Sequence, residues 1–266
     1  MPLDPETMAD LGAVAHDLAD AARVETLRHF RRPGLEAESK RADFDPVTEA
    51  DRAAERAMRD ILAARRPDDG ILGEEYGTQE GRSGLTWILD PIDGTRGFVA
   101  GTPTWGVLIA VSDADGPCLG VIDQPYIGER FFGSDSVAEL SGPQGKNRLA
   151  TRPPRALAEA TLFTTFPEVG SAADRAGFER VARQVRLTRY GMDCYAYALV
   201  AAGQVDLVIE AGLAPYDIAA PIAVIEAAGG IVTDWAGRPA HGGGRVLAAA
   251  NAQVHTAALA LLSADA

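Results

Sequence analysis

Five apolar residues recur three or four positions apart near the start of the chain: Met8, Leu11, Ala15, Leu18 and Ala22. Polar residues, among them several aspartates, stand between them. This spacing predicts an amphipathic helix of about 20 residues or more, ended by the Pro-Gly pair at 33–34. A second helix is predicted from Ala50 to Arg66, because Pro67 would stop it.

Short apolar runs bounded by turn residues predict strands in the rest of the first half. The runs at 105–112, 117–124 and 130–133 follow one another closely, so we expect one antiparallel sheet. An earlier strand is predicted over 71–74 and ends in acidic residues. Residues 79–84 are polar and rich in glycine, which favours a surface loop.

Strand-like and helix-like stretches alternate in the second half. Strands are predicted at 161–165, 185–187, 205–210, 231–234 and 246–250, and helices at 194–202, 218–228 and 251–262. Residues 141–155 show little apolar pattern, so we place a boundary there, between an N-terminal α+β half (1–145) and a C-terminal α/β half (146–266) of one compact unit. Periodicity alone predicts an α/β or α+β protein with mixed sheets.

The charge of the chain restricts its partners. The formal net charge of −13 argues against nucleic acid or an anionic membrane as a partner. No apolar run approaches the ~20 residues of a membrane span, and the acidic N-terminus lacks the features of a signal peptide. Cys118 and Cys194 stand far apart without a C-x-x-C pattern, which favours reduced thiols and a cytoplasmic protein.

Residues 88–98 carry the most informative chemistry, in the order Ile-Leu-Asp-Pro-Ile-Asp-Gly-Thr-Arg-Gly-Phe. The first two predict the end of a buried strand, which should stop near Asp90 because Pro91 cannot donate to a sheet ladder. Asp90 and Asp93 would then lie on a loop at the strand end, next to the backbone amides of a Gly-Thr pair. Carboxylates for a hard cation beside amides for a phosphate favour Mg²⁺-dependent phosphate chemistry. The same residue types also favour a plain turn.

Three further segments carry acids in a compatible order. They are Val47-Thr48-Glu49-Ala50-Asp51, Gly73-Glu74-Glu75 and Pro215-Tyr216-Asp217-Ile218-Ala219-Ala220. Together with 87–98 they resemble the signatures of the inositol monophosphatase superfamily: G-E-E, W-x-x-D-P-[IL]-D-G-T-x-x-F and W-D-x-A-[AG]. Tyr216 departs from the tryptophan of the last signature. The resemblance extends from about residue 10 to 262, and it implies a layered α-β-α-β-α sandwich, a homodimer, and an Mg²⁺-dependent phosphatase that acts on a small phosphate ester.

The resemblance also implies roles for individual residues. Two Mg²⁺ ions would clamp the phosphoryl group, and Glu74 could reach a third, weaker ion through water. The implied ligands are Glu74, Asp90 and the carbonyl of Ile92 for the first ion, and Asp90, Asp93 and Asp217 for the second. Thr95 and its partner Asp51 would orient and deprotonate the attacking water, and the amides of Gly94 and Thr95 would hold a phosphate oxygen.

Several of these residues have a purely structural alternative. Glu74 could pair with a surface arginine, Asp217 could cap the helix that follows it, and Thr95 could be a helix N-cap. Phe98 and Trp105 could wall the substrate site, although core positions fit both better.

Two runs resemble the histidinol-phosphate phosphatase branch of the superfamily. They are Arg-Tyr-Gly-Met-Asp-Cys-Tyr-Ala-Tyr at 189–197 and Gly-Val-Ile-Asp-Gln-Pro at 120–125. The leading hypothesis is therefore the hydrolysis of histidinol phosphate in histidine biosynthesis. The alternatives are an inositol-1-phosphate or broad sugar-phosphate phosphatase and, from another class, a regulatory binding protein without catalysis.

The choice of substrate depends on the non-phosphate end of the ligand. Asp193 and Glu210 would place two negative charges there, and a cationic amino alcohol gains charge-assisted hydrogen bonds from them. Arg189 and Gly191 are the other expected substrate contacts. Asp193 could instead form an ion pair with Arg189.

Overall fold

The computed structural model describes residues 3–32, 38–39, 46–135 and 137–263. Its helices are α1 (Pro5–His29), α2 (Glu49–Arg65), α3 (Thr95–Ala100), α4 (Ala172–Ala182), α5 (Tyr195–Ala201), α6 (Pro215–Ala227) and α7 (Ala252–Leu262), with a 3₁₀ turn at Leu157–Glu159. Its strands are β1 (Glu38–Ser39), β2 (Pro46–Val47), β3 (Gly70–Gly73), β4 (Gly77–Gln79), β5 (Thr86–Asp93), β6 (Gly106–Ser112), β7 (Pro117–Gln124), β8 (Glu129–Ser134), β9 (Val137–Gly142), β10 (Gly145–Arg148), β11 (Thr161–Thr164), β12 (Leu187–Tyr190), β13 (Leu207–Leu213), β14 (Ile231–Thr233) and β15 (Gly244–Ala249).

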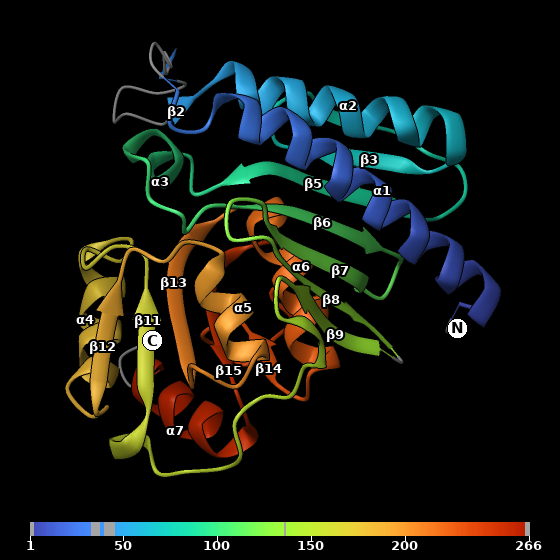
Figure 1. Ribbon diagram of the computed structural model, residues 1–266. Helices are drawn as coiled ribbons and strands as arrows, with labels where there is room; N and C mark the ends of the chain where they lie inside the picture. The colour runs from blue at the N-terminus through green and yellow to red at the C-terminus, as the bar shows by residue number, and fades with distance from the viewer. Residues whose placement is uncertain (1–2, 33–37, 40–45, 136, 264–266) are drawn as a thin grey trace.

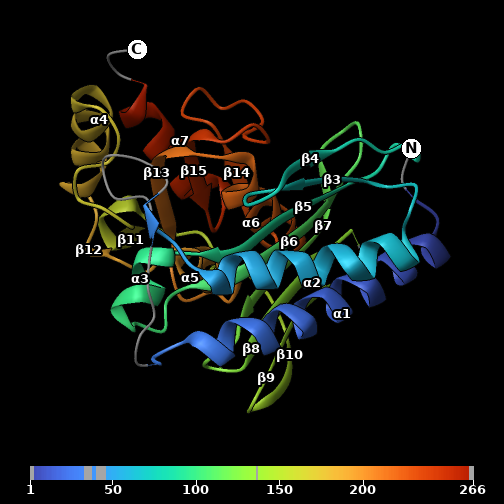
Figure 2. The same cartoon turned by 90° about the horizontal axis from the view of Figure 1, so that it is seen from above.

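Two sheets form the frame of the molecule. The larger one has the strand order β10-β9-β8-β7-β6-β5-β3-β4, the smaller one has the order β12-β11-β13-β15-β14, and β1 pairs with β2. Figure 1 shows α1 and α2 on the outer face of the larger sheet, α5 and α6 between the sheets, and α4 and α7 on the outer side of the smaller sheet. Seen from above, α1 and α2 lie side by side (Figure 2). This arrangement confirms the expected α-β-α-β-α layers.

The first predicted helix is confirmed as α1. Leu11, Ala15, Leu18 and Ala22 are fully buried and pack in one cluster with residues of α2 and the larger sheet, whereas Met8 is only partly buried. The Pro-Gly pair expected to end this helix, at 33–34, lies outside the described residues, and α1 ends at His29. The second predicted helix agrees with α2 to within one residue at each end.

Strand β5 does not stop near Asp90, and that prediction is wrong. The strand pairs Asp90 with Leu108 of β6, skips two residues, and pairs again at Asp93 with Gly106. Pro91 lies in this irregular step, where the absence of an N–H costs no ladder hydrogen bond. The two aspartates therefore lie on a bulge of a sheet strand and not on a free loop.

The other predicted elements are present in the structure, although α6 begins three residues earlier and β13 two residues later than expected. Strands β1, β2, β4 and β9 have no counterpart in the sequence-based prediction, and β4 includes the first residue of the loop predicted over 79–84. Strand β10, over 145–148, pairs with β9 in a segment for which the sequence shows little pattern, and the chain crosses to the smaller sheet after it. Helix α4 is absent from the prediction, and β12 begins two residues later than expected. The successive antiparallel strands β6, β7 and β8 are confirmed. The division into halves at 145 and 146 stays a prediction.

The run at 120–125 helps to hold α1 against the larger sheet. Asp123 of β7 is fully buried, and its carboxylate accepts hydrogen bonds from Arg23 of α1 and from Arg130 of β8, with the closest contact to each at 2.6 Å. These bonds fix α1 on the sheet. Asp123 is not among the residues that line the cavity described below. None of the helices in the described part of the chain has both the length and the apolar character needed to cross a bilayer.

Candidate active site

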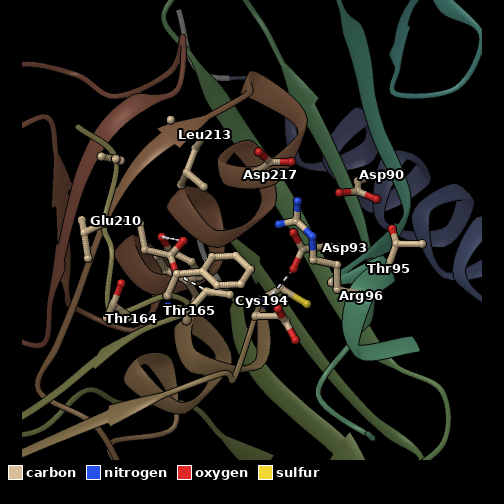
Figure 3. Close-up of a pocket in the computed structure, with 18 of the residues that line it drawn as sticks. Asp90, Asp93, Thr95, Arg96, Thr164, Thr165, Cys194, Glu210, Leu213 and Asp217 are labelled. Carbon is tan, nitrogen blue, oxygen red and sulfur yellow. Dashed lines mark hydrogen bonds between the residues drawn. The ribbon is translucent and has the colours of Figure 1, made fainter. Parts of the chain in front are cut away.

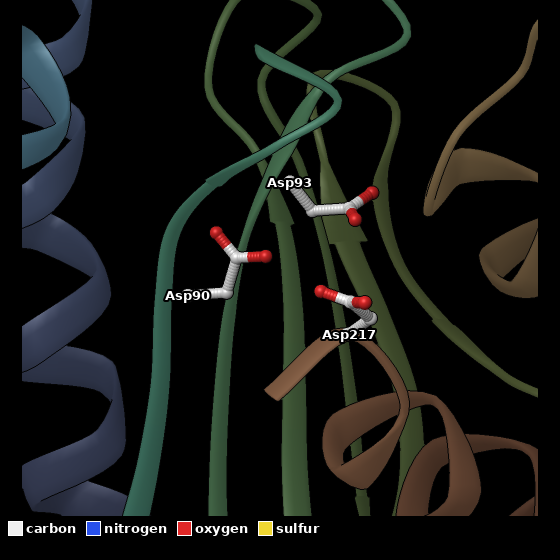
Figure 4. Close-up of side chains that lie close together, drawn as sticks. All are labelled: Asp90, Asp93 and Asp217. Atoms are coloured by element: carbon white, nitrogen blue, oxygen red, sulfur yellow. The ribbon is translucent and has the colours of Figure 1, made fainter. Parts of the chain in front are cut away.

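Three carboxylates from two distant parts of the chain meet at the C-terminal end of β5, an interior strand of the larger sheet. Asp90 and Asp93 stand on the bulge of β5, and Asp217 stands in the first turn of α6 (Figure 4). One carboxylate oxygen from each lies within 4.8 Å of those of the other two. Oxygen ligands at this spacing suit a hard divalent cation.

A backbone amide donates a hydrogen bond to each of these carboxylates. The N–H of Ile92 donates to Asp90 at 3.0 Å. The N–H of Cys194 donates to Asp93 at 2.7 Å, and the N–H of Ala214 donates to Asp217 at 2.7 Å. The last bond is a helix capping contact, so the structural alternative for Asp217 is observed and coexists with its place in the cluster.

The electrostatics of the cluster favour a bound cation. Burial raises the pKa of Asp90 well above its ordinary value, and the charges of Glu74, Asp93 and Asp217 raise it further. Burial likewise raises the pKa of Asp93, with the charges of Asp217 and Asp193 adding to it. A divalent cation among these oxygens would lower the pKa values of both aspartates again, since an opposite charge favours the ionised form. The donor set therefore fits Mg²⁺.

A cavity of about 550 Å³ opens over this cluster. The residues of the sequence-based prediction that line it are Glu74, Asp90, Ile92, Asp93, Gly94, Thr95, Asp193, Glu210 and Asp217. Three others do not line it: Asp51, Arg189 and Gly191. Asp51 lies behind Thr95, and Arg189 is an exposed residue of the edge strand β12. The structure thus gathers residues from both sheets around one space.

Thr95 and Asp51 are neighbours, as the resemblance implies. The Thr95 hydroxyl lies 3.0 Å from the carbonyl oxygen of Ile92 and 3.4 Å from Oδ1 of Asp51. The other oxygen of Asp51 accepts the N–H and the hydroxyl of Thr48, which starts α2. Burial raises the pKa of Asp51 to about 6, although the bonds from Thr48 oppose this. Gly94 has φ of +81°, a conformation that glycine adopts without strain, and this brings Thr95 to the start of α3.

Glu210 stands at the far end of the cavity. Figure 3 shows it beside Thr164 and Thr165, across the cavity from Asp90. One of its oxygens accepts both the N–H and the hydroxyl of Thr165, and the other accepts the hydroxyl of Tyr197 at 3.2 Å. Burial raises its pKa, and the bonds from Thr165 oppose the increase. The result is a buried acid in a fixed orientation.

Asp193 contacts Thr104, whereas Arg189 was its alternative partner in the sequence-based prediction. Its carboxylate accepts the hydroxyl of Thr104 at 2.9 Å, and no ion pair between it and Arg189 is found in the described part of the chain. Burial raises the pKa of Asp193, and the charge of Arg96 opposes this. Its side chain also lies against Gly94, where an added Cβ would come within 2.7 Å of it. Asp193 thus contacts the turn that presents Thr95.

Several residues that line the cavity are absent from the sequence-based prediction, and Arg96 and Phe166 are two exposed ones among them. Arg96 of α3 and Phe166, which follows β11, both line the cavity, and the guanidinium carbon lies 5.2 Å from the centre of the ring. Arg96 was visible as a cation beside the acidic motif. Phe166 carried no signal, because only the parallel pairing of β11 with β13 brings it here. Phe98 and Trp105 are buried in a common cluster, which confirms core positions for both.

Comparison with known proteins relates nearly all of the chain to one family. The inositol monophosphatase family matches residues 8–265. Two similar proteins are a bifunctional phosphatase, IMPL2, of Arabidopsis thaliana, 44% identical over 229 residues, and a histidinol-phosphatase of Chlorobaculum parvum, 37% identical over 240 residues. These alignments cover 85% and 90% of the chain, and 64% and 91% of the two relatives. Among solved structures, an inositol monophosphatase from Zymomonas mobilis has a TM-score of 0.85 and 39% identity, covering 98% of this chain and 99% of that one.

Proposed function

The chain belongs to the inositol monophosphatase family of metal-dependent phosphatases, and from this we propose that it hydrolyses histidinol phosphate to histidinol and inorganic phosphate. The observation that carries the proposal is the buried, fixed carboxylate of Glu210 at the end of the cavity remote from the acidic cluster. An ammonium or imidazolium group of the substrate would make a charge-assisted hydrogen bond there. The histidinol-phosphatase among the relatives supports the same substrate.

The acidic cluster defines where the phosphate binds in this proposal. Glu74, Asp90, the carbonyl of Ile92, Asp93 and Asp217 would hold Mg²⁺, which would polarise the phosphoryl oxygens and lower the pKa of a bound water. The cation is proposed to be Mg²⁺, with two or three ions in each site. The homodimer and the cytoplasmic location stay predictions.

Residues of the chain would then accept the proton of the attacking water and orient the ester. The Thr95 hydroxyl oxygen would accept a hydrogen bond from the attacking water. The proton of that water would then move by way of Thr95 toward Asp51, whose Oδ1 lies 3.4 Å from the hydroxyl. The water oxygen bonds to phosphorus as the ester P–O bond breaks, and the released alcohol oxygen takes up a proton from solvent, which balances the proton passed toward Asp51. Glu210 and Asp193 would hold the organic part of the substrate so that the ester oxygen is placed opposite the attacking water.

The test compares phosphate release from histidinol phosphate, inositol-1-phosphate and p-nitrophenyl phosphate with Mg²⁺ present. Glu210→Gln should reduce kcat/KM for histidinol phosphate by about 10- to 150-fold, since a hydrogen bond to a charged group contributes about 1.5–3 kcal/mol. The loss on p-nitrophenyl phosphate should be small. Glu168→Gln is the matched control, because Glu168 lines the same cavity but is exposed. Equal losses in both variants would contradict a specific role for Glu210.

Inositol-1-phosphate is the second candidate substrate. The similar structure from Zymomonas mobilis is an inositol monophosphatase, which favours it. A neutral polyol would also donate hydroxyl hydrogen bonds to Glu210, but without charge assistance. A kcat/KM for inositol-1-phosphate above that for histidinol phosphate would replace the first proposal by this one.

A further inference from the structure

We propose that Glu55 of α2 is a positioning residue that fixes the backbone of Glu74 beside Asp90 and thereby sets the affinity for the divalent cation. The inference rests on the proposed role of Glu74 as a metal ligand. Glu55 does not line the cavity, and so it would act through the main chain that carries Glu74 and not on the substrate.

Three successive amides hold the chain at Glu74. The N–H of Glu74 itself donates to the carbonyl of Leu89, the residue before Asp90, at 3.1 Å. The next two amides, of Glu75 and Tyr76, donate to the carboxylate of Glu55 at 2.7 and 3.2 Å. The turn after β3 is therefore attached on one side to the strand that carries the acidic bulge, and on the other side to α2.

The carboxylate of Glu55 is itself well fixed. It is fully buried, and Nε of Arg59, one helical turn later, donates to it at 2.8 Å. The guanidinium of Arg59 also donates to the carbonyl of Gly77 and so contacts the same turn. A Cβ added to Gly73 would lie 1.9 Å from Oε1 of Glu55, so the carboxylate lies directly against this glycine. Gly73 leaves the space that Glu55 needs.

The opposite end of β3 provides a contrast. Asp69 is also a buried carboxylate, and it accepts hydrogen bonds from the indole N–H of Trp87 at 2.9 Å and from Arg66 at 2.7 Å. It stands before the strand and is not among the residues that line the cavity. Asp69→Asn should therefore reduce stability without changing the position of Glu74, which makes it the matched control for Glu55→Gln.

The experiment measures the binding of Mg²⁺ and Mn²⁺ to EDTA-stripped protein by calorimetry, and the increase in Tm that each cation produces. Glu55→Gln retains the shape of the side chain, but its amide group cannot accept all the donors that face it. We expect the cation dissociation constant to rise about 10- to 100-fold, the usual effect of removing a group that orients a metal ligand. At saturating Mg²⁺, the KM for histidinol phosphate should stay near that of the unsubstituted protein.

A second variant tests the same contact by another route. Gly73→Ala would displace the Glu55 carboxylate and should weaken cation binding in the same direction. Asp69→Asn should lower Tm with cation affinity unchanged. Unchanged cation binding in Glu55→Gln or in Gly73→Ala, or an equal loss in Asp69→Asn, would overturn the inference.

Glu74→Gln separates this inference from the proposed function. If Glu74→Gln weakens cation binding and Glu55→Gln does not, the positioning role alone fails. If Glu74→Gln leaves cation binding unchanged, Glu74 is not a metal ligand, and both its proposed role and the inference fail.

Discussion

We expect the buried carboxylate of Asp51 to lower the stability of the metal-free protein, although the proposed reaction needs it. Its side chain is only 1% exposed, and burial raises its pKa from 3.8 to about 6. Replacing it with asparagine preserves the capping contact, because the amide oxygen can still accept the N–H and hydroxyl of Thr48. The amide nitrogen would then face the oxygen of Thr95. Asp51→Asn should therefore stabilise the metal-free protein at neutral pH while it reduces kcat.

The pKa gives the sign and the size of the effect. The folded state binds this proton more tightly than the unfolded chain, so the contribution to stability is complete below pH about 4 and is lost as the pH rises through about 6. At 1.36 kcal/mol per pH unit, the difference between 3.8 and about 6 corresponds to at most about 3 kcal/mol. For a chain of this size, that would raise the Tm of the variant by roughly 5–10 °C at pH 8 and by little at pH 4.

The assay is thermal unfolding of both proteins in EDTA from pH 4 to 8, with kcat measured separately in Mg²⁺. Asp174→Asn is the matched control, because Asp174 accepts the N–H and hydroxyl of Ser171 in the same capping geometry at the start of α4. Burial alone would raise the pKa of Asp174. The bonds from Ser171 and the charge of Arg245 outweigh burial, so the pKa lies below its ordinary value. Asp174→Asn should thus destabilise, and more so at pH 7 than in acid. A difference in Tm between Asp51→Asn and the parent that does not grow with pH would refute the reasoning.

Three further outcomes are expected. EDTA should abolish turnover and Mg²⁺ should restore it with a higher Tm, whereas full activity after stripping would contradict a metal-dependent site. Asp90→Asn should reduce kcat more than Asp93→Asn in parallel assays, because Asp90 would bridge two ions; the reverse order would exclude the bridge. Asp193→Ala should lower kcat/KM for histidinol phosphate about 10- to 150-fold and affect p-nitrophenyl phosphate much less. Equal losses on both substrates would show that Asp193 acts by supporting the turn at Gly94.

The sequence predicts most of the elements and the residues of the acidic cluster, because these depend on local patterns. The run 88–98 combines a buried strand, two acids and a glycine turn, and each of these has a short-range signal. The bulge that lets β5 continue to Asp93 has none, since it depends on the pairing with β6. Helix α4 escaped prediction because its apolar face is interrupted, with Phe178 and Val181 buried among charged neighbours.

The walls of the cavity could not be predicted in the same way. Thr165 meets Glu210 because β11 and β13 are parallel neighbours, although 45 residues separate the two side chains in the sequence. The run 120–125 resembles a substrate-specific branch, yet its acid is bonded inside the framework. The residue type and its motif thus indicate which chemistry a side chain can perform. The order of the strands decides whether that side chain lies in the cavity or in the core.

The acidic cluster shows how the larger sheet and the two helices α5 and α6 form one site. Each of Asp90, Asp93 and Asp217 is held by one backbone amide, and the amide that holds Asp93 belongs to Cys194, 101 residues away at the start of α5. Three neutral amides do not compensate three crowded carboxylates, since burial and mutual charge still raise the pKa of Asp90 and of Asp93. The fold therefore fixes the orientation of the acids, while burial and mutual repulsion still disfavour the ionised forms of Asp90 and Asp93. A cation that binds there meets oxygens already in place, and its binding free energy is not used to assemble them.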